Sequence, residues 1–261
     1  MTLAGRVALV TGAGRGIGRA AAEKLAAEGA LLVVNDLDEG PAKETVEAIE
    51  AAGGTAVVCA GSVTEADLPE RLVATAVDTY GGIDVVVNNA GIVRNSYLAR
   101  MSDEHWSTVL DVHLTAPFRI LRAAQPVLSA AARAEEAAGR PRHRKVVNVS
   151  SIVGTAGSPS QANYASAKAG LLGLTRTLAK EWGRYRVNVN AVAFGIVDTR
   201  MTREGGAEAQ EALRRGAAAA PLARAGTPEE AAGAVWMLCA PESDYVTGQV
   251  LLCGGGLTSV G

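Results

Sequence analysis

Short apolar runs alternate along the chain with longer stretches in which apolar residues recur at helical spacing. The runs are rich in Val, Leu and Ala and show little alternation with polar residues. Runs of this kind indicate strands buried on both faces, which is typical of a parallel sheet covered by helices on both sides. The expected strands lie at 6–10, 31–34, 56–59, 84–87, 146–149, 186–192 and 250–252.

The helical stretches between these runs complete a regular alternation of strand and helix. Gly29 ends the first helix, as glycine commonly does at helix C-termini. The expected helices lie at 17–28, 41–52, 65–80, 103–128, 162–182 and 228–238. No internal repeat or interdomain linker interrupts the pattern, and 261 residues fit one α/β layer fold. We therefore expect an α/β protein with one doubly wound, Rossmann-like domain over residues 1–261.

A glycine-rich segment at 11–18 joins the first expected strand to the first expected helix. Glycine is needed where the chain turns tightly and where the backbone approaches a pyrophosphate, and the helix N-terminus then directs N–H groups at the phosphates. An ordinary strand–helix turn is the alternative, but the flanking elements favour dinucleotide binding. The candidate cofactor contacts in this turn are Gly12, Arg15, Gly16, Ile17 and Gly18.

Asp36 stands at the end of the second expected strand, about twenty residues beyond the glycine turn. A carboxylate there accepts hydrogen bonds from the hydroxyls of the adenosine ribose and repels a 2′-phosphate. Its neighbours bring no compensating cation, so the sequence favours NAD over NADP. Two alternatives stay open: Asp36 as a solvated strand end, and Arg15 as a contact to a 2′-phosphate.

Ser151, Tyr164 and Lys168 form the candidate catalytic set. Tyr164 and Lys168 share one helix face at i and i+4, and Ser151 follows the fifth expected strand, at the sheet edge where α/β folds bind ligands. An unperturbed tyrosine, with a pKa of about 10, is too weak a base near neutrality. We expect the lysine ammonium and the nicotinium charge to lower that pKa. An exposed helix face is the alternative interpretation of the Tyr–Lys pair.

These residues resemble those of the short-chain dehydrogenase/reductases, and the likeness covers essentially the whole chain. It is carried by 11–18, 88–91, Ser151, Tyr164 with Lys168, and 195–199. The resemblance implies a seven-stranded parallel sheet flanked by helices, hydride transfer between NAD(H) and a secondary alcohol or ketone, and a homotetramer. It also implies cofactor contacts at Ser62 and Val63 beside the adenine, Asn89 and Gly91 along the adenosine half, Val197 and Thr199 at the nicotinamide carboxamide, and Tyr164 and Lys168 themselves.

The chain departs from the family pattern at two candidate site positions. The family usually has Asn in the helix after the fourth strand, where its backbone carbonyl helps to hold a proton-relay water, and the matching residue here is His113. A backbone role survives this substitution, and His113 is also a candidate for titrating within the relay; a space-filling helix residue is the alternative. Ser62 replaces the common Asp near the adenine, which removes one charged contact.

The substrate is indicated only through the resemblance. Residues 158–164 and 188–191 look like the 3-oxoacyl-thioester reductase branch and also resemble 3-hydroxyacyl-CoA dehydrogenase modules. Both reactions interconvert a β-ketone and a β-alcohol, so we expect a thioester of acyl carrier protein or coenzyme A. Steroids, sugars, diols and other small secondary alcohols stay open, because fold and catalytic set do not choose the substrate. The remaining alternatives are epimerase or dehydratase chemistry and a non-catalytic dinucleotide-sensing regulator.

Charge and cysteine content narrow the class of protein further. The formal net charge of −2 argues against nucleic acid or a membrane surface as a partner. Cys59, Cys239 and Cys253 form no CxxC pair, so we expect reduced thiols and no metal site. The first residues lack the features of a signal peptide, and no apolar run approaches the roughly 20 residues that span a bilayer. We therefore expect a cytoplasmic enzyme.

Two further segments have candidate roles in binding. Residues 140–145, with the sequence RPRHRK, are expected to form either a solvated loop or a docking point for an acidic carrier protein or the phosphates of coenzyme A. Residues 200–220 are polar and alanine-rich, and they are placed to act as a lid over the substrate.

Overall fold

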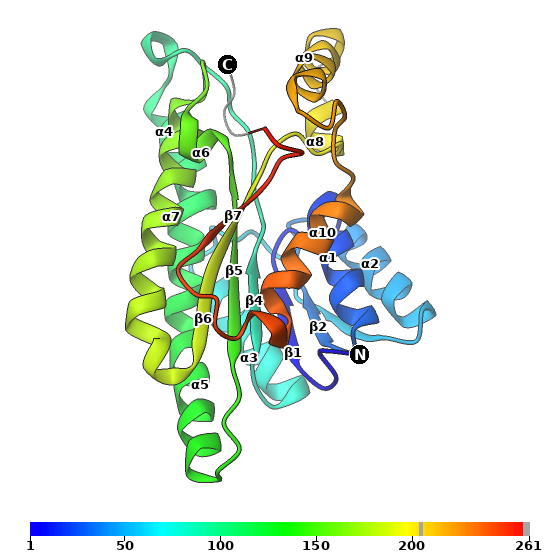
Figure 1. The fold of residues 1–261 in the computed structure, drawn as a ribbon, viewed down its shortest axis with the longest axis vertical. Helices are drawn as coiled ribbons and strands as arrows, with labels where there is room; N and C mark the ends of the chain where they lie inside the picture. Colours follow the sequence, from blue (N-terminus) through cyan, green and yellow to red (C-terminus); the bar gives the residue numbers. More distant parts are fainter. Residues whose placement is uncertain (204–205, 258–261) are drawn as a thin grey trace.

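The computed structural model describes residues 1–203 and 206–257. Within them, seven strands run parallel in one sheet in the order β3-β2-β1-β4-β5-β6-β7 (Figure 1). The chain builds outward from β1 to β3, returns to place β4 beside β1, and then builds outward to β7, so the predicted doubly wound α/β fold is confirmed. The strands are β1 Val7–Val10, β2 Leu31–Val34, β3 Thr55–Val58, β4 Val85–Asn88, β5 Arg144–Ser151, β6 Val187–Phe194 and β7 Val250–Cys253.

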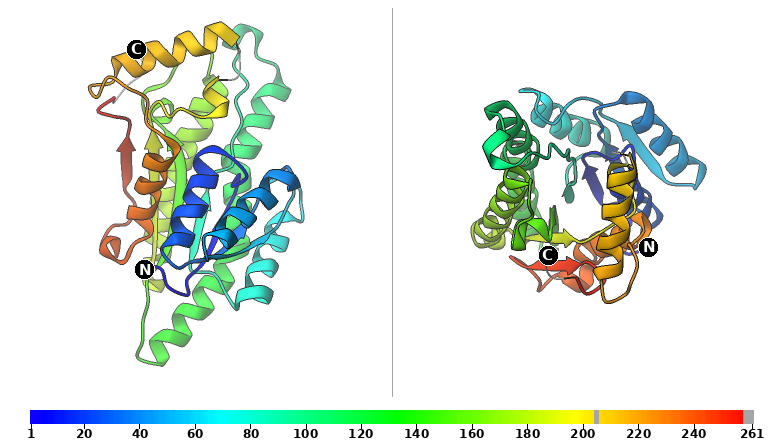
Figure 2. Two further views of the ribbon diagram at one scale, coloured as in Figure 1. Left: turned by 90° about the vertical axis from the view of Figure 1, so that its right-hand side faces the viewer. Right: turned by 90° about the horizontal axis from the view of Figure 1, so that it is seen from above.

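Helices cover both faces of the sheet (Figures 1 and 2). The helices α1, α2 and α10 pack over one face, and α3, α5 and α7 pack over the other. The bounds are α1 Gly16–Ala27, α2 Glu39–Ala51, α3 Leu68–Tyr80, α4 Asp103–Leu110, α5 Ala116–Ala137, α6 Val153–Ala156, α7 Ala162–Trp182, α8 Arg200–Arg203, α9 Gly206–Ala219 and α10 Pro228–Cys239. Among the described residues, 3-10 turns lie at Leu98–Arg100, Gly183–Tyr185 and Pro241–Ser243.

The strand β1 shows why the apolar runs are continuous. Ala8 and Val10 belong to the buried cluster beneath α1 and α10, whereas Val7 and Leu9 belong to the cluster beneath α3 and α5. Successive side chains of a strand point to opposite faces, so a strand covered on both sides needs an apolar residue at every position.

The single helix expected at 103–128 is wrong in two respects. The chain forms α4, then a π-helical segment at Asp111–Thr115, then α5, which continues to Ala137. Pro117, in the first turn of α5, has no N–H to donate to the His113 carbonyl four residues earlier, so a regular α-helical pattern cannot pass through this point. The helix α5 outlasts its apolar pattern because its last two turns are rich in alanine, the strongest helix former.

The strand β5 begins at Arg144, two residues before the expected start, because part of the basic cluster is buried and paired. The Arg144 guanidinium donates two hydrogen bonds to the Glu135 carboxylate, at 2.9 and 3.0 Å. The Lys145 Nζ atom lies 2.7 Å from Asp244 Oδ1. Only 140–142 are fully exposed, so the expectation of a solvated basic loop over the whole cluster is wrong.

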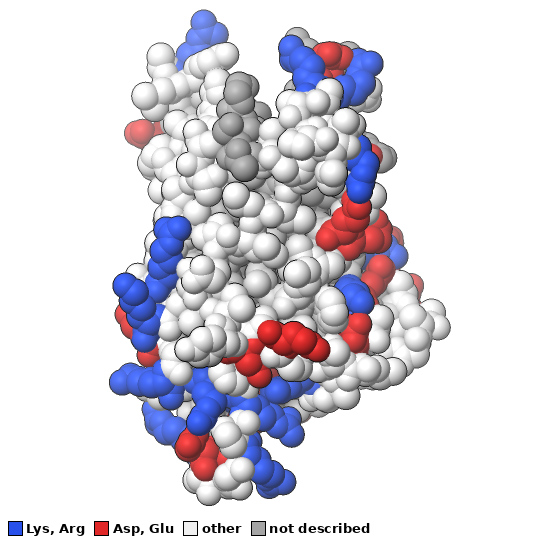
Figure 3. Space-filling model, in the orientation of Figure 1, with Lys and Arg blue, Asp and Glu red and all other residues white. Residues whose placement is uncertain are grey.

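This basic region lies at the amino edge of the sheet. Lys and Arg side chains gather at the lower end of the molecule, where α5 ends and β5 begins (Figure 3). Ser151 is at the other end of β5, roughly 23 Å away at about 3.3 Å per residue. Within one chain, the exposed cations at 140–142 are therefore far from the candidate catalytic set.

The helices α8 and α9 stand beyond the carboxyl ends of the strands (Figures 1 and 2). They occupy most of the expected lid at 200–220, of which residues 204–205 lie outside the described residues, and the lid action stays a prediction. Throughout 1–203 and 206–257, every helix is too short or too polar to cross a lipid bilayer.

Candidate active site

The glycine turn after β1 is packed too closely for larger residues. Gly12 has φ +61°, and a Cβ there would lie 2.8 Å from the Ala90 Cα atom. A Cβ on Gly18 would overlap the Gly12 carbonyl oxygen. Glycine is therefore required at both positions, for conformation at the first and for close approach at both.

Side chains that directly follow β1 and β4 hold this turn in place. The Thr11 hydroxyl accepts hydrogen bonds from the backbone N–H groups of Asn89 and Ala90, at 3.0 and 3.1 Å. The Asn89 amide donates in return to the carbonyls of Thr11 and Gly12, at 2.9 and 3.0 Å. Asn89 thus binds the backbone of the glycine turn. Thr11 is a supporting residue, and its place in the glycine motif did not reveal this role.

The turn and α1 fit the phosphates of a dinucleotide. The helix starts at Gly16, and Arg15 at its N-cap makes no side-chain hydrogen bond to the amides of the first turn. Those N–H groups and the positive end of the helix dipole suit a pyrophosphate. Ile17 packs its side chain against the core, and the Thr199 methyl would lie 3.6 Å from a Cβ on Gly16, so the loop after β6 reaches the same place.

Asp36 is fixed beside the glycine turn. Its Oδ2 atom accepts a hydrogen bond from the Gly14 N–H at 2.8 Å, and its Oδ1 atom accepts one from the Asp38 N–H at 3.2 Å. Arg15 reaches Asp38 rather than standing alone, with 3.3 Å between Nη1 and Oδ2. The basic side chain in the turn therefore has an acidic neighbour that the sequence pattern did not identify as its partner.

Ser151, Tyr164 and Lys168 come together at the carboxyl edge of the sheet. The Lys168 Nζ atom lies 5.6 Å from the centre of the Tyr164 ring. Ser151 Oγ accepts a hydrogen bond from the Val153 N–H at 3.1 Å, and a hydrogen bond with Ser151 lowers the pKa of Tyr164. The three predicted catalytic side chains therefore form one cluster.

The two titratable members of this cluster are shifted by burial. Burial raises the pKa of Tyr164 to about 12, and the hydrogen bond with Ser151 only partly offsets this rise. The lowering expected from Lys168 and the nicotinium charge together stays a prediction. Burial also lowers the pKa of Lys168 to about 7, so that near neutrality its amine is divided between charged and neutral forms. The Lys168 Nζ atom donates to the Val149 carbonyl at 2.6 Å.

His113 lies between the candidate catalytic cluster and the loop that follows β4. Its ring meets the Tyr164 ring edge-on, with 5.0 Å between centroids and an interplanar angle of 83°. Its Nε2 atom lies 3.0 Å from the Ile92 N atom and 2.7 Å from the Ile92 O atom. Burial, together with the charge of Lys168, lowers the pKa of His113 well below its usual range, so the expected titration within a relay is not supported.

The other predicted cofactor contacts lie in loops that follow β3 and β6. Val63 is buried in the core, and the Ser62 hydroxyl is 2.8 Å from the Thr64 hydroxyl. Val197 is also buried, and the Thr199 N–H donates a hydrogen bond to the Thr202 hydroxyl oxygen at 2.9 Å. Their roles toward a cofactor therefore stay predictions.

Asn163 is a supporting residue that sequence reasoning missed. Its Nδ2 atom donates to the carbonyls of Arg94 and His105, at 3.0 and 3.1 Å, and its Oδ1 atom accepts from the Tyr164 N–H at 2.8 Å. The side chain thereby fixes the start of α7, and with it the backbone of Tyr164. Its position directly before the tyrosine was the only signal, and that position does not disclose partners so distant in sequence.

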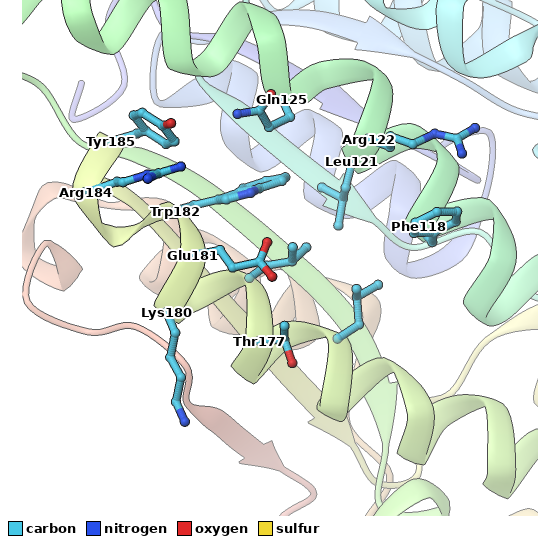
Figure 4. Close-up of a pocket in the computed structure, with 12 residues that line it drawn as sticks. Phe118, Leu121, Arg122, Gln125, Thr177, Lys180, Glu181, Trp182, Arg184 and Tyr185 are labelled. Carbon is cyan, nitrogen blue, oxygen red and sulfur yellow. The ribbon is translucent and has the colours of Figure 1, made fainter.

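A groove of about 690 Å³ lies elsewhere, between α5 and α7 (Figure 4). Its floor includes Leu121 and Trp182, and charged side chains including Arg122, Lys180 and Glu181 line it as well. It contains none of the predicted catalytic or cofactor residues, so it is distinct from the cluster described above.

Comparison with known proteins agrees with this geometry. Residues 12–258 match the model of a family described as Enoyl-(Acyl carrier protein) reductase. Over 258 residues the chain is 40% identical to 3-oxoacyl-(acyl-carrier-protein) reductase FabG of Thermotoga maritima, covering 98% of this chain and 99% of the relative. It is 42% identical over 257 residues to 3-oxoacyl-(acyl-carrier-protein) reductase of Synechocystis sp., covering 98% of each. It is also 42% identical over 254 residues to Short-chain reductase protein NovJ of Streptomyces niveus, covering 96% and 93%.

The matches run from the glycine turn past β7, so they include both the predicted cofactor contacts and the candidate catalytic cluster. The relatives are also covered almost end to end. The predicted resemblance is therefore confirmed, and the chain belongs to the short-chain dehydrogenase/reductase family.

Proposed function

We propose that this protein reduces the ketone of a 3-oxoacyl thioester with NADH. One observation carries the proposal: Ser151, Tyr164 and Lys168 form a cluster in a chain that also has a dinucleotide-type glycine turn. The chain is about 40% identical to proteins named 3-oxoacyl-(acyl-carrier-protein) reductase. The identity extends over nearly the whole chain, so it includes the loops at the carboxyl edge of the sheet as well as the candidate catalytic cluster.

The described residues suit a nicotinamide dinucleotide, because the turn is cradled by glycines and the first amides of α1 are uncapped by side chains. When bound, the cofactor supplies the hydride for the ketone carbon. The residues that would hold it are Gly12, Arg15, Gly16, Ile17, Gly18, Asp36, Ser62, Val63, Asn89, Gly91, Tyr164, Lys168, Val197 and Thr199.

Tyr164 would supply the proton that completes the reduction. Because its pKa is about 12, the phenol is protonated near neutrality and can donate to the alkoxide that forms on the substrate oxygen. Ser151 would hold that oxygen by a hydrogen bond. Lys168 would hold positive charge near the phenolate left behind, and its pKa of about 7 lets it exchange a proton in the physiological range.

The preference for NADH over NADPH rests on the charges around Asp36. The Gly14 N–H fixes the Asp36 carboxylate next to the turn, where it would accept the ribose hydroxyls and repel a 2′-phosphate. Arg15, the cation that would otherwise attract that phosphate, lies against Asp38. Two carboxylates and one guanidinium leave an excess of negative charge at this position.

Other substrates remain alternatives that a direct assay separates. The name of NovJ specifies a reductase but no thioester, which favours testing other secondary alcohols and ketones, including steroids, sugars and diols. The description of the family model names an enoyl substrate, which favours testing reduction of a carbon–carbon double bond. A regulator that binds the dinucleotide without turnover would give binding but no reaction with any of them.

The partner and assembly expectations are also proposals. The relatives' names support an acyl carrier protein as the partner that presents the substrate, whereas the cluster at 140–145 gives little support because it lies at the other edge of the sheet. The homotetramer implied by the family stays a proposal that light scattering on the purified chain tests directly.

The deciding experiment measures NADH oxidation with acetoacetyl-CoA, crotonyl-CoA and a panel of ketones lacking a thioester. We expect the highest kcat/KM with the acetoacetyl thioester and a lower kcat/KM for NADPH than for NADH. A higher kcat/KM with crotonyl-CoA would replace ketone reduction by enoyl reduction. NADH binding without turnover of any substrate would favour the regulator.

A further inference from the structure

His113 fills the space between the cofactor loop after β4 and the catalytic tyrosine on α7. It is 2% exposed, and its Nδ1 atom is buried without a hydrogen-bond partner in the described part of the chain. Its Nε2 atom faces the Ile92 peptide, and its ring edge meets Tyr164. One side chain therefore touches both halves of the candidate active site.

The contact with Ile92 is one that a neutral imidazole can make in either tautomer. With the proton on Nε2, the ring donates to the Ile92 carbonyl oxygen at 2.7 Å. With the proton on Nδ1, the Nε2 lone pair accepts from the Ile92 N–H at 3.0 Å. A charged ring would place a second N–H in a buried position that lacks an acceptor, beside the Lys168 amine.

The space on the other side of the ring is provided by Gly91. A Cβ added to Gly91 would lie 2.5 Å from the His113 Cε1 atom. The ring cannot turn aside without giving up its contact with Ile92 on one side or Tyr164 on the other. The imidazole of His113 therefore requires glycine at position 91.

We propose that His113 is a positioning residue that stays neutral and acts as a wedge, fixing the backbone at Gly91 and Ile92 together with the ring of Tyr164. It sets the cofactor loop and the proton donor in one arrangement through a single side chain. The inference rests on the proposed function for the importance of Tyr164, but the fit of Gly91, Ile92 and His113 does not depend on the substrate.

The charged surroundings of His113 agree with a neutral wedge. From α7 it faces Tyr164 and the Lys168 amine. From the loop after β4 it faces Gly91 and Ile92, which carry no titratable side chain. The π-helical segment that contains His113 also contains Asp111, which is exposed to solvent. No carboxylate in this set faces the ring to favour its protonation.

The first experiment tests whether positions 91 and 113 are matched in size. It measures the Kd for NADH by fluorescence titration. Asparagine has no atom at the place of the imidazole Cε1, so H113N makes room for the methyl group introduced by G91A. In the wild-type background, we expect G91A to raise the Kd for NADH by about tenfold or more. In the H113N background, we expect the factor by which G91A raises the Kd to be smaller by about threefold or more. Equal weakening by G91A in both backgrounds would overturn the proposed fit.

The second experiment tests the hydrogen bond to Ile92. H113Q retains an amide that can reach the Ile92 peptide, whereas H113L fills similar space without polar atoms. We expect H113L to weaken NADH binding by about tenfold and to lower kcat, because the Ile92 peptide groups are left unpaired, and we expect H113Q to recover most of both losses. Thermal melting verifies that each variant is folded. Equal NADH affinity in folded H113L and the wild type would refute the positioning role.

The pH dependence separates a neutral wedge from a titrating relay. H113Q cannot titrate, so its acidic limb of kcat/KM should match that of the wild type, in which Lys168 titrates near neutrality. An acidic limb that disappears in H113Q would show that His113 titrates and would overturn its neutrality. The matched control is H143N, because His143 lies at the opposite edge of the sheet and bonds Asn188 at 2.8 Å.

These readouts distinguish the inference from the function on which it rests. If the wild type binds no NADH, the proposed function fails together with this inference. If it binds NADH and reduces a different substrate, only the thioester assignment fails, and the comparison of G91A in the two backgrounds still decides the role of His113.

Discussion

Two buried lysines, Lys145 at the start of β5 and Lys168 on α7 beside the end of β5, have different surroundings. Lys145 and Lys168 are each 3% exposed. The Lys145 Nζ atom lies 2.7 Å from Asp244 Oδ1 and 3.1 Å from the Ser243 hydroxyl. The Lys168 Nζ atom donates to the Val149 carbonyl, and in the described part of the chain no carboxylate forms an ion pair with it.

The difference separates a lysine with a counter-ion from one without an ion pair in the described part of the chain. At the amino edge, desolvation lowers the pKa of Lys145, but the hydrogen bond and the charge of Asp244 oppose this shift. At the carboxyl edge, the desolvation of Lys168 is not offset, and its pKa falls to about 7. Perturbed groups of this kind gather at functional sites because the lost stability is exchanged for a usable proton.

The largest effect should come from removing the unpaired lysine. We expect Lys168→Met to lower kcat at least about 100-fold, because the charge that supports the Tyr164 phenolate is lost. Lys145→Met is the matched control and should retain turnover per folded molecule. Steady-state NADH oxidation with the acetoacetyl thioester measures both variants. Equal turnover in the two variants would remove the distinction between these lysines.

The pH dependence of stability should differ in the same way. The folded-state pKa of Lys168 is about 7, against an ordinary value of 10.5, so between these values the unfolded chain binds more protons than the folded chain. The free energy of unfolding of the wild type should therefore rise relative to that of Lys168→Met as pH increases through this window. The expected rise is on the order of a few kcal/mol, measured by urea unfolding at several pH values. Parallel curves for the two proteins would show that Lys168 titrates normally.

Breaking the paired lysine should cost stability rather than activity. Asp244→Asn leaves Lys145 buried without its counter-ion, and we expect a loss of about 1–2 kcal/mol in the free energy of unfolding. The expected loss is small because Asp244 is 43% exposed and solvent screens the pair. Chemical unfolding at neutral pH measures this loss. A large fall in kcat with unchanged stability would place Lys145 in the catalytic machinery instead.

The smallest effect concerns an exposed pair, Arg15 with Asp38. We expect Asp38→Asn to raise kcat/KM for NADPH relative to NADH by about two- to fivefold, because Arg15 becomes available to a 2′-phosphate while Asp36 still repels it. Ratios of kcat/KM for the two cofactors provide the measurement. An increased preference for NADH would contradict the role given to Asp38.

Local patterns in the sequence predicted those features that depend on neighbours along the chain. The strand–helix alternation follows from hydrophobic periodicity, and the shared face of Tyr164 and Lys168 follows from their i, i+4 spacing. The glycine turn was recognisable because the backbone restricts residue size at Gly12 and Gly18. These features need no knowledge of distant partners.

The features that were missed depend on contacts between distant segments. Asp244 pairs with Lys145 from almost one hundred residues away, so the basic cluster gave no sign that part of it is buried. The pKa of Tyr164 depends on burial, which no spacing reveals, so the rise that burial causes was not predicted. The break at Asp111–Thr115 required weighing Pro117 against a helical pattern that otherwise continued.

The most direct test of the central claim is Tyr164→Phe, assayed for NADH binding and for reduction of the acetoacetyl thioester. The change removes the hydroxyl but keeps the ring that packs against His113. We predict NADH affinity close to that of the wild type and a fall in kcat of at least about 100-fold. Turnover equal to that of the wild type would contradict the assignment of Tyr164 as the proton donor.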